Sequence, residues 1–268
     1  MFDWSLPRDD LSRHNREGFR PPPHERSRGP VSRIRVSVRR FADLQFGSIW
    51  RDLAVLLPNI RGTIADVGSG AQPFRYLLPK DVKYIATDID EAERKFGYRA
   101  DDTRYFQGAA LPLEDGEADA ILCTETLEHV LDTGAFLREL ARSLSPGGVL
   151  ILTVPFAARW HFVPHDYWRF TPSGLNHILS KASFGEVRVY ARGGALAVAA
   201  YKVLGYVLLL LSGYGRHGAK AAPWRILGLC LMPLAALAAL LGNLGLSYPG
   251  PAEDTLGYTV LARKHVEP

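Results

Sequence analysis

The chain has 268 residues, of which 47% are apolar and 22% charged, so it is long enough for one large domain with an added element. Its net charge is +4, but residues 1–40 hold ten Arg against five acids, which leaves the remainder of the chain at −1. That near-neutral body argues against a nucleic-acid-binding protein. The two cysteines, Cys123 and Cys230, exclude a disulfide-rich scaffold and fit a reducing, cytoplasmic compartment.

The chain opens with a polar segment and continues into an α/β pattern. Residues 1–40 are rich in Arg and Pro without periodicity, which predicts a flexible arm. A helix is expected over 41–57, because its apolar residues recur at helical spacing and Pro58 ends it. Strands and helices then alternate, which predicts a parallel sheet covered by helices on both faces. The expected strands are 63–67, 83–88, 118–124, 149–155, 186–192 and 256–264, and the expected helices are 74–78, 133–144 and one beginning after Thr171.

A turn with two glycines follows the first of these strands. The strand ends in Asp66, and Gly68 and Gly70 follow it, so the backbone can approach a bound ligand where a Cβ would collide. The dinucleotide-binding fingerprint requires a third glycine three residues later, and here Gln72 and Pro73 occupy that region. The turn by itself is therefore equally compatible with a tight connection in any α/β protein.

The stretches that follow make the pattern more specific. The next strand, "VKYIATDID", carries Asp88 near its end, where a carboxylate can accept hydrogen bonds from both hydroxyls of a ribose. Then come "LPLEDGEADAIL", "TETLEHV" and "LRELARSLSPGGVLILTVPF". Together with the glycine turn, this ordered series resembles the class I S-adenosylmethionine-dependent methyltransferases, type 11-like, a broad group that includes quinone-biosynthesis enzymes. The resemblance covers about 60–192 and the last strand. It implies a Rossmann-like fold with a seven-stranded, mostly parallel sheet, divided here into 41–193 and 255–268.

The same resemblance implies a set of cofactor contacts for S-adenosyl-L-methionine. Asp66, Gly68 and Gly70 would line the methionine end, Asp88 would hold the ribose, and Ile89 and Gln107 would contact the adenine. Family members often have an acid or an amide at the position of Gln107, whose carbonyl can accept a hydrogen bond from the adenine amino group. Glu125 would face the cofactor on the acceptor side. For Glu128 and His129, structural roles such as helix capping are as compatible with the pattern as catalysis.

The loop after Pro155 must lie over the reacting methyl group, because ligands in open parallel sheets bind beyond the carboxyl ends of the strands. An oxygen acceptor needs a base, and a histidine suits that role because its pKa is near neutral. The catalytic candidates are His165, His161 and Asp166, and the acceptor-binding candidates are Tyr167, Arg169 and Glu125. Arg169 could clamp a phosphate or carboxylate. In the alternative interpretation the loop is an aromatic lid in which Asp166 pairs with Arg169. No Cys or His spacing indicates a metal site.

Two long apolar segments lie between the last two strands. Residues 195–211 contain one charge and 226–246 contain none, and each helix would approach the thickness of a bilayer. An insertion between neighbouring strands must return to the same side, so 194–254 is predicted to form a helical hairpin. The basic residues in its connection would lie outside if both helices crossed, which favours a hairpin in the cytoplasmic leaflet. The alternative is a buried pair that covers the sheet or forms a homodimer interface. The arm could add attraction to anionic lipid, or could be a solvated tail.

These observations predict an enzyme that methylates, at oxygen, a lipophilic or lipid-linked small molecule at the inner face of the membrane. A catalytically inactive scaffold that keeps the methyltransferase fold is the alternative. Nucleic acid is not an expected partner, because the arginines are not on a folded face and no base-flipping motif is present.

Overall fold

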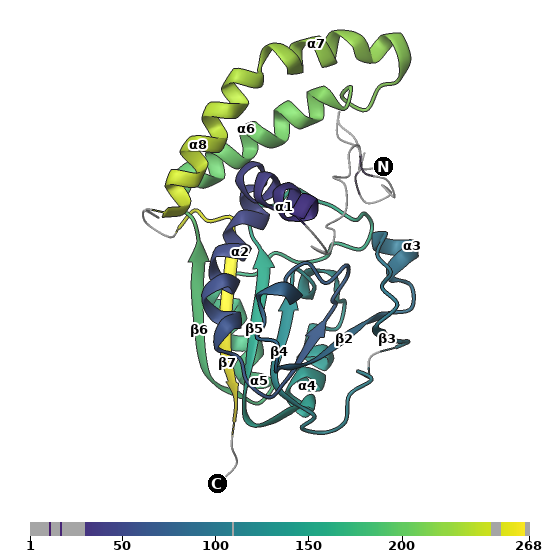
Figure 1. Ribbon diagram of the computed structural model, residues 1–268, viewed down its shortest axis with the longest axis vertical. Coiled ribbons are helices and arrows are strands. Elements are labelled where there is room, and N and C mark those ends of the chain that lie inside the picture. Colours follow the sequence, from purple (N-terminus) through teal and green to yellow (C-terminus); the bar gives the residue numbers. More distant parts are fainter. Residues whose placement is uncertain (1–10, 12–16, 18–29, 109, 248–252, 266–268) are drawn as a thin grey trace, which may run out of the picture.

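A sheet of seven strands forms the centre of the computed structural model, which describes residues 11, 17, 30–108, 110–247 and 253–265 (Figure 1). The strands lie in the order β3-β2-β1-β4-β5-β7-β6. They are β1 (Thr63–Val67), β2 (Lys83–Ile89), β3 (Thr103–Phe106), β4 (Ala118–Thr124), β5 (Leu144–Pro155), β6 (Phe184–Arg192) and β7 (Gly257–Lys264). The first five strands pair in parallel, and β7 runs antiparallel between β5 and β6. The predicted Rossmann-like, mostly parallel sheet is confirmed.

Two apolar clusters show that helices cover both faces of the sheet. On one face, α4 (Thr133–Ser143) and α5 (Pro172–Lys181) bury Leu137, Leu140 and Leu175 against β4, β5 and β7. The opposite face is covered by α2 (Leu44–Leu56) and the turn after β1. The segment expected as a helix at 74–78 is only a short 3-10 turn at Arg75–Leu77. The edge strand β3 was not predicted, because it has only four residues and none of them is fully buried.

The helix expected over 41–57 is two helices. The first, α1 (Pro30–Ala42), begins inside the segment interpreted as the flexible arm, so 30–40 are helical. Asp43 breaks the helix and caps the second, α2, by accepting a hydrogen bond from the backbone N–H of Phe46 at 3.2 Å. The remainder of the predicted arm lies outside the described residues except for positions 11 and 17. Glu17 forms an ion pair with Arg159 at 3.7 Å.

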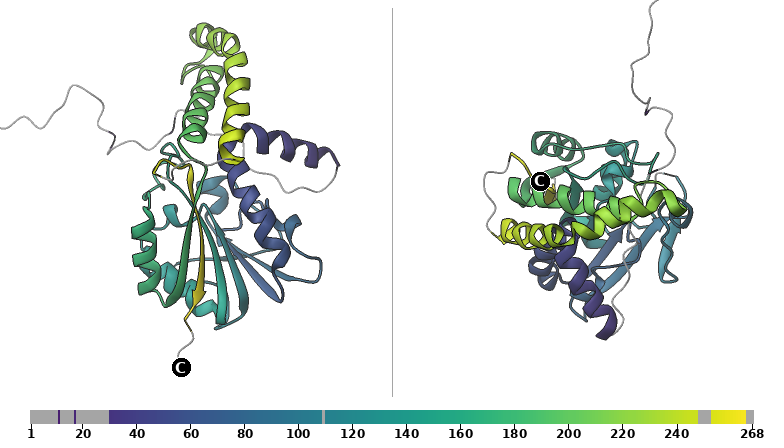
Figure 2. Two further views of the ribbon diagram at one scale, coloured as in Figure 1. Left: turned by 90° about the vertical axis from the view of Figure 1, so that its left-hand side faces the viewer. Right: turned by 90° about the horizontal axis from the view of Figure 1, so that it is seen from above.

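The predicted insertion before the last strand is a helical hairpin that rises from the carboxyl end of the sheet (Figures 1 and 2). It consists of α6 (Ala195–Leu211), α7 (Ala222–Cys230) and α8 (Met232–Ser247), with α8 packed against α6. Gly242 permits close packing at the base, since a Cβ there would lie 2.3 Å from Leu44 Cδ1 of α2. No single described helix has the length and apolarity to cross a membrane, and only the pair Gly218–Cys230 and Met232–Ser247, bent by 52°, passes that test together. The bend adjoins Pro233, which lacks the N–H that would bond the preceding turn.

Candidate active site

The glycine turn follows the end of β1 and packs against the segment that follows β4. Gly68 has a φ of +72° and Gly70 a φ of +50°, a region that residues with side chains rarely adopt. A Cβ on Gly68 would lie 2.3 Å from the Thr126 hydroxyl oxygen, whereas one on Gly70 would only touch the Tyr98 ring at 3.5 Å. Gly68 is therefore required both by its backbone conformation and by the space available.

Asp66 is a buried acid beneath this turn, with only 2% of its surface exposed. Its Oδ2 accepts a hydrogen bond from the Tyr84 hydroxyl at 2.6 Å, and burial raises the pKa of the Asp66 carboxyl to about 7. Oδ1 has no hydrogen-bond partner among the described residues, and neither does the hydroxyl of Ser69 in the turn itself. Orphaned buried polar atoms carry a free-energy cost, so this edge of the turn fits a polar ligand that would satisfy them.

Asp88 is placed at the end of β2, directly beside the turn. Its Oδ2 accepts from the Gly70 backbone N–H at 2.9 Å and its Oδ1 from the Ile89 N–H at 2.8 Å. Each carboxylate oxygen has a second lone pair, so two ribose hydroxyls could still donate to it. Burial is the main cause that raises the pKa of Asp88, and the two backbone N–H groups oppose that rise.

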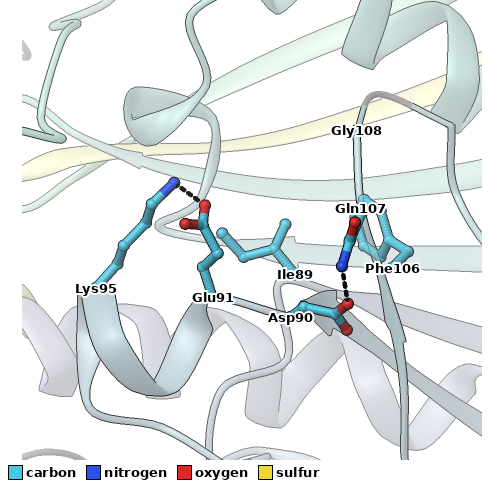
Figure 3. Close-up of a pocket in the computed structure, with 7 residues that line it drawn as sticks. All are labelled: Ile89, Asp90, Glu91, Lys95, Phe106, Gln107 and Gly108. Carbon is cyan, nitrogen blue, oxygen red and sulfur yellow. Dashed lines mark hydrogen bonds and ion pairs between the residues drawn. The ribbon is translucent and has the colours of Figure 1, made fainter.

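A pocket of about 390 Å³ opens next to Asp88, at the ends of β2 and β3 (Figure 3). Its lining residues are Ile89, Asp90, Glu91, Lys95, Phe106, Gln107 and Gly108. Gln107 donates through Nε2 to Asp90 at 2.9 Å, which leaves its carbonyl oxygen as an acceptor. The apolar side chains of Ile89 and Phe106 with one amide acceptor suit a flat heterocycle that carries an amino group.

Glu125 follows β4 and is held by residues that sequence reasoning missed. Arg192, at the end of β6 and only 2% exposed, donates to Glu125 Oε1 at 2.9 Å, and Gln45 Nε2 of α2 donates to Oε2 at 2.9 Å. Arg192 also donates to the Val154 carbonyl at 3.0 Å. Both carboxylate oxygens of Glu125 therefore have protein partners, and a direct role in binding the acceptor stays a prediction.

Three of the predicted site residues lock together in the loop after β5. Asp166 accepts two hydrogen bonds from Arg169, at 2.6 and 2.8 Å, and lies 2.9 Å from Nδ1 of His161. These donors hold the pKa of Asp166 well below its usual range although burial opposes them. Arg169 donates further to the Arg159 carbonyl at 3.1 Å. The Asp166–Arg169 pair, left open as an alternative, is present, and a clamp on the acceptor by Arg169 stays a prediction.

His165 and Tyr167 lie at the outer side of the same loop. Nδ1 of His165 is 3.2 Å from the Tyr167 hydroxyl, and its ring centroid is 6.4 Å from that of Phe96 in α3 (Ala92–Phe96). α3 also carries Lys95, which lines the pocket, so His165 lies against a helix that borders the pocket. Partial burial, followed by the charges of Lys95 and Arg94, lowers the pKa of His165. Its imidazole is therefore neutral at neutral pH and able to accept a proton.

The structure also gathers two residues that the sequence left undecided, Glu128 and His129. Glu128 is completely buried, and its Oε1 lies 3.6 Å from Nε2 of His129. The His129 ring is 5.1 Å from that of His161, which comes from the loop after β5. The sequence signal for Glu128 and His129 was their position directly after a buried strand. Their neighbour His161 lies 32 positions beyond His129, so no local pattern predicts the contact.

The residues predicted for S-adenosylmethionine are thus brought to one edge of the sheet. Asp66, Gly68 and Gly70 surround the turn, Asp88 adjoins it, and Ile89 and Gln107 line the neighbouring pocket. The orphaned oxygen of Asp66 and the remaining lone pairs of Asp88 fit a ligand with a polar end and a ribose. These contacts are proposals for the cofactor rather than observed ones.

Comparison with known proteins finds similarity to methyltransferases over part of the chain. A family model described as a methyltransferase domain matches residues 65–152. A ubiquinone biosynthesis O-methyltransferase of Caulobacter vibrioides is 32% identical over 117 residues, covering 38% of this chain and 44% of its own length. A probable S-adenosylmethionine-dependent methyltransferase of Mycolicibacterium smegmatis is 34% identical over 76 residues, covering 27% and 30%. The chain thus spans less than half the length of the curated relatives it matches.

Among solved structures, a possible histamine N-methyltransferase from Thermotoga maritima superposes with a TM-score of 0.49 at 18% identity, over 86% of this chain and 96% of that one. We draw no functional argument from a superposition of this quality. The matched segment 65–152 runs from β1 to β5 and contains the glycine turn, Asp88 and Gln107. The segment from β1 to β5 therefore matches a methyltransferase domain, and the fold that contains this segment is interrupted before its last strand by a helical insertion.

Proposed function

We propose that this chain transfers a methyl group from S-adenosylmethionine to an oxygen of a lipophilic or lipid-linked small molecule at the cytoplasmic face of a membrane. The observation that carries the proposal is a shared location. The glycine turn, the histidine loop and the base of the apolar hairpin all lie at the carboxyl end of the sheet (Figure 1). Relatives named as ubiquinone biosynthesis O-methyltransferases support oxygen as the acceptor atom.

The bound cofactor supplies an electrophilic methyl group on a sulfonium, and the chain must orient the acceptor and take its proton. We assign the proton to His165, because its imidazole is half-buried, neutral and next to α3 of the cofactor pocket. The Tyr167 hydroxyl at 3.2 Å from Nδ1 fixes the ring. Asp166 acts as a positioning residue, since it holds His161 and Arg169 in the loop.

The pH dependence follows from the direction of the shift. A base must be neutral to accept a proton, so the rate falls when the pH drops through the pKa of His165. Because that pKa is lowered from 6.5, the midpoint of the fall lies below pH 6.5. The variant His165→Gln keeps the size of the side chain but cannot take a proton, and we expect it to lower kcat by about 10²–10⁴-fold while the affinity for the cofactor is kept.

The exposed apolar surface of the hairpin supports the proposed location at a membrane. Its lower half is buried against the domain, where Leu44 meets Ala197, Ala200, Ala238 and Leu256. Large apolar residues are exposed along the whole length of the hairpin: Leu196, Tyr206, Leu208, Ile226, Leu227, Leu229, Met232, Leu234, Leu237, Leu240, Leu241 and Leu244. An exposed patch of this extent on a globular protein marks an interaction site. A hairpin with 17 residues in α6 and a bent return fits insertion into one leaflet better than two straight crossings.

The test measures methyl transfer and membrane binding on the same preparations. Full-length protein is incubated with vesicles of bacterial membrane lipid extract and methyl-labelled S-adenosylmethionine, and label in the lipid phase is counted. We expect label with the wild type, none with Asp88→Ala and little with His165→Gln. Cofactor binding without label in any extract would instead support the inactive scaffold.

Flotation with the same vesicles tests the hairpin. Leu229→Asp and Leu237→Asp, both on its exposed surface, should release the protein from the vesicles, because a carboxylate in the leaflet is expensive. Val55→Asp is the matched control, since Val55 is also exposed but lies on α2 outside the hairpin. Equal flotation of all variants would refute the membrane role. A concentration-dependent dimer that the same Asp substitutions break would assign the surface to a second copy.

A further inference from the structure

Three potential metal ligands lie close together where the segment after β4 meets the loop after β5. Glu128, His129 and His161 each offer one ligand atom, and the three atoms lie within 4.8 Å of one another. Glu128 and His129 come from the segment after β4, and His161 comes from the loop after β5, so two neighbouring strand ends bring the set together. Two imidazoles and one carboxylate form a donor set that divalent transition metals prefer.

Hydrogen bonds at the far side of each ring orient both imidazoles as ligands. Nδ1 of His129 lies 2.6 Å from the carbonyl oxygen of His165, and a carbonyl can only accept, so Nδ1 carries the hydrogen. Nδ1 of His161 lies 2.9 Å from Oδ2 of Asp166, which Arg169 holds in place from the other side. In the neutral form of each ring, Nε2 is then the nitrogen without a hydrogen and can bind a metal ion. Metal-bound histidines are held in the same way by a carboxylate or a carbonyl.

The carboxylate is an independent observation that points to a ligand. Glu128 has 0% of its surface exposed, and neither of its oxygens has a hydrogen-bond partner among the described residues. Leaving a buried carboxylate without partners costs several kcal/mol, and natural structures rarely keep such a group without a reason.

We propose that Glu128, His129 and His161 bind one divalent transition-metal ion. Bonds of about 2.0–2.2 Å in a tetrahedral site place neighbouring ligand atoms about 3.3–3.6 Å apart. Glu128 Oε1 and His129 Nε2 are already 3.6 Å apart, so a small movement of the loop that carries His161 completes the site. Glu125 is not included, because Arg192 and Gln45 hold both of its oxygens.

Three protein ligands leave at least one coordination position for a small molecule. The site lies at the carboxyl end of β4, two residues after Thr126, whose side chain contacts Gly68 of the glycine turn. An acceptor oxygen that occupied the open position would become more acidic, because a metal ion lowers the pKa of a bound hydroxyl. This last step depends on the proposed function, whereas metal binding itself does not.

The experiment measures metal binding directly, without turnover. Untagged full-length protein is treated with a chelator, dialysed and titrated with Co²⁺ while its visible absorption is recorded, and with Zn²⁺ by calorimetry. We expect one ion per chain and a Co²⁺ spectrum of low-coordinate type. Glu128→Gln and His161→Ala should abolish the spectrum. Asp166→Asn keeps all three ligands but loses the charge that supports His161 and Arg169, and it should weaken affinity by about 10–100-fold.

His177→Ala is the matched control, because it removes an exposed histidine of α5 far from the cluster, and it should bind like the wild type. Circular dichroism checks that each variant is folded like the wild type. If His161→Ala is not folded, His161→Gln takes its place. Absence of saturable binding, or binding that survives both Glu128→Gln and His161→Ala, would overturn the assignment. Failure of methyl transfer with metal binding intact would leave this site standing and refute only the proposed function.

Discussion

Replacing the two glycines of the turn one at a time separates backbone strain from lack of space. Gly68 and Gly70 share a positive φ, so alanine at either position costs about 1–2 kcal/mol of unfolding free energy through its conformation. Only at Gly68 does the new Cβ also collide, at 2.3 Å from the Thr126 hydroxyl oxygen and 2.6 Å from its methyl carbon. Forcing an extra carbon into packed surroundings adds about 1–3 kcal/mol. We therefore expect a loss of about 2–5 kcal/mol for Gly68→Ala.

The assay is urea unfolding in one detergent, followed by tryptophan fluorescence and without cofactor. Thr126→Ala in the Gly68→Ala background removes the two nearest atoms and leaves only a Cβ at 3.0 Å, so it should restore about 1–2 kcal/mol. Equal destabilisation by Gly68→Ala and Gly70→Ala, or no recovery in the double variant, would show that the turn and the segment after β4 are not packed as described.

Two further predictions concern buried charges. Arg192→Met should lower the unfolding free energy by about 3–5 kcal/mol, because it removes the charged partner of the Glu125 carboxylate. Adding Glu125→Gln should recover part of this loss. Additive losses in the double-mutant cycle would contradict the ion pair. The pKa of Asp66 is raised to about 7, so the folded state holds a proton that the unfolded state releases above about pH 4. The unfolding free energy should therefore fall as the pH rises from about 4 to 7, by up to about 1.4 kcal/mol per pH unit. Asp66→Asn should flatten that slope. An unchanged slope in the variant would refute the raised pKa of Asp66.

The central sheet could be predicted from the sequence because its signals are local. Buried parallel strands appear as short apolar runs. The ends of β1 and β2, which contain Asp66 and Asp88, were predicted to within one residue. The edge strand β3 escaped, since its four residues are only partly buried and lack the apolar run. The break at Asp43 was missed because the apolar spacing continues across it, whereas its side chain caps a new helix.

The candidate site was predictable only in part. Asp88 and Gln107 were assigned from the resemblance to the methyltransferases, and the structure places Gln107 in the lining of the pocket and Asp88 directly before Ile89 of that lining. Arg192 lies 67 positions from Glu125, and its role depends on β6 ending beside the segment after β4, which no local pattern encodes. The same holds for the contact of His161 with His129, made by loops from two neighbouring strands.

The most direct test of the account is calorimetric titration of the purified chain with S-adenosylhomocysteine, for the wild type and for Asp88→Ala. Asp88 would accept two hydrogen bonds from the ribose, each worth about 1.5–3 kcal/mol because the acceptor is charged. We expect saturable binding at one site per chain, weakened at least about 100-fold in a folded Asp88→Ala variant. Near-wild-type affinity in that variant, or no binding by the well-folded wild type, would contradict it.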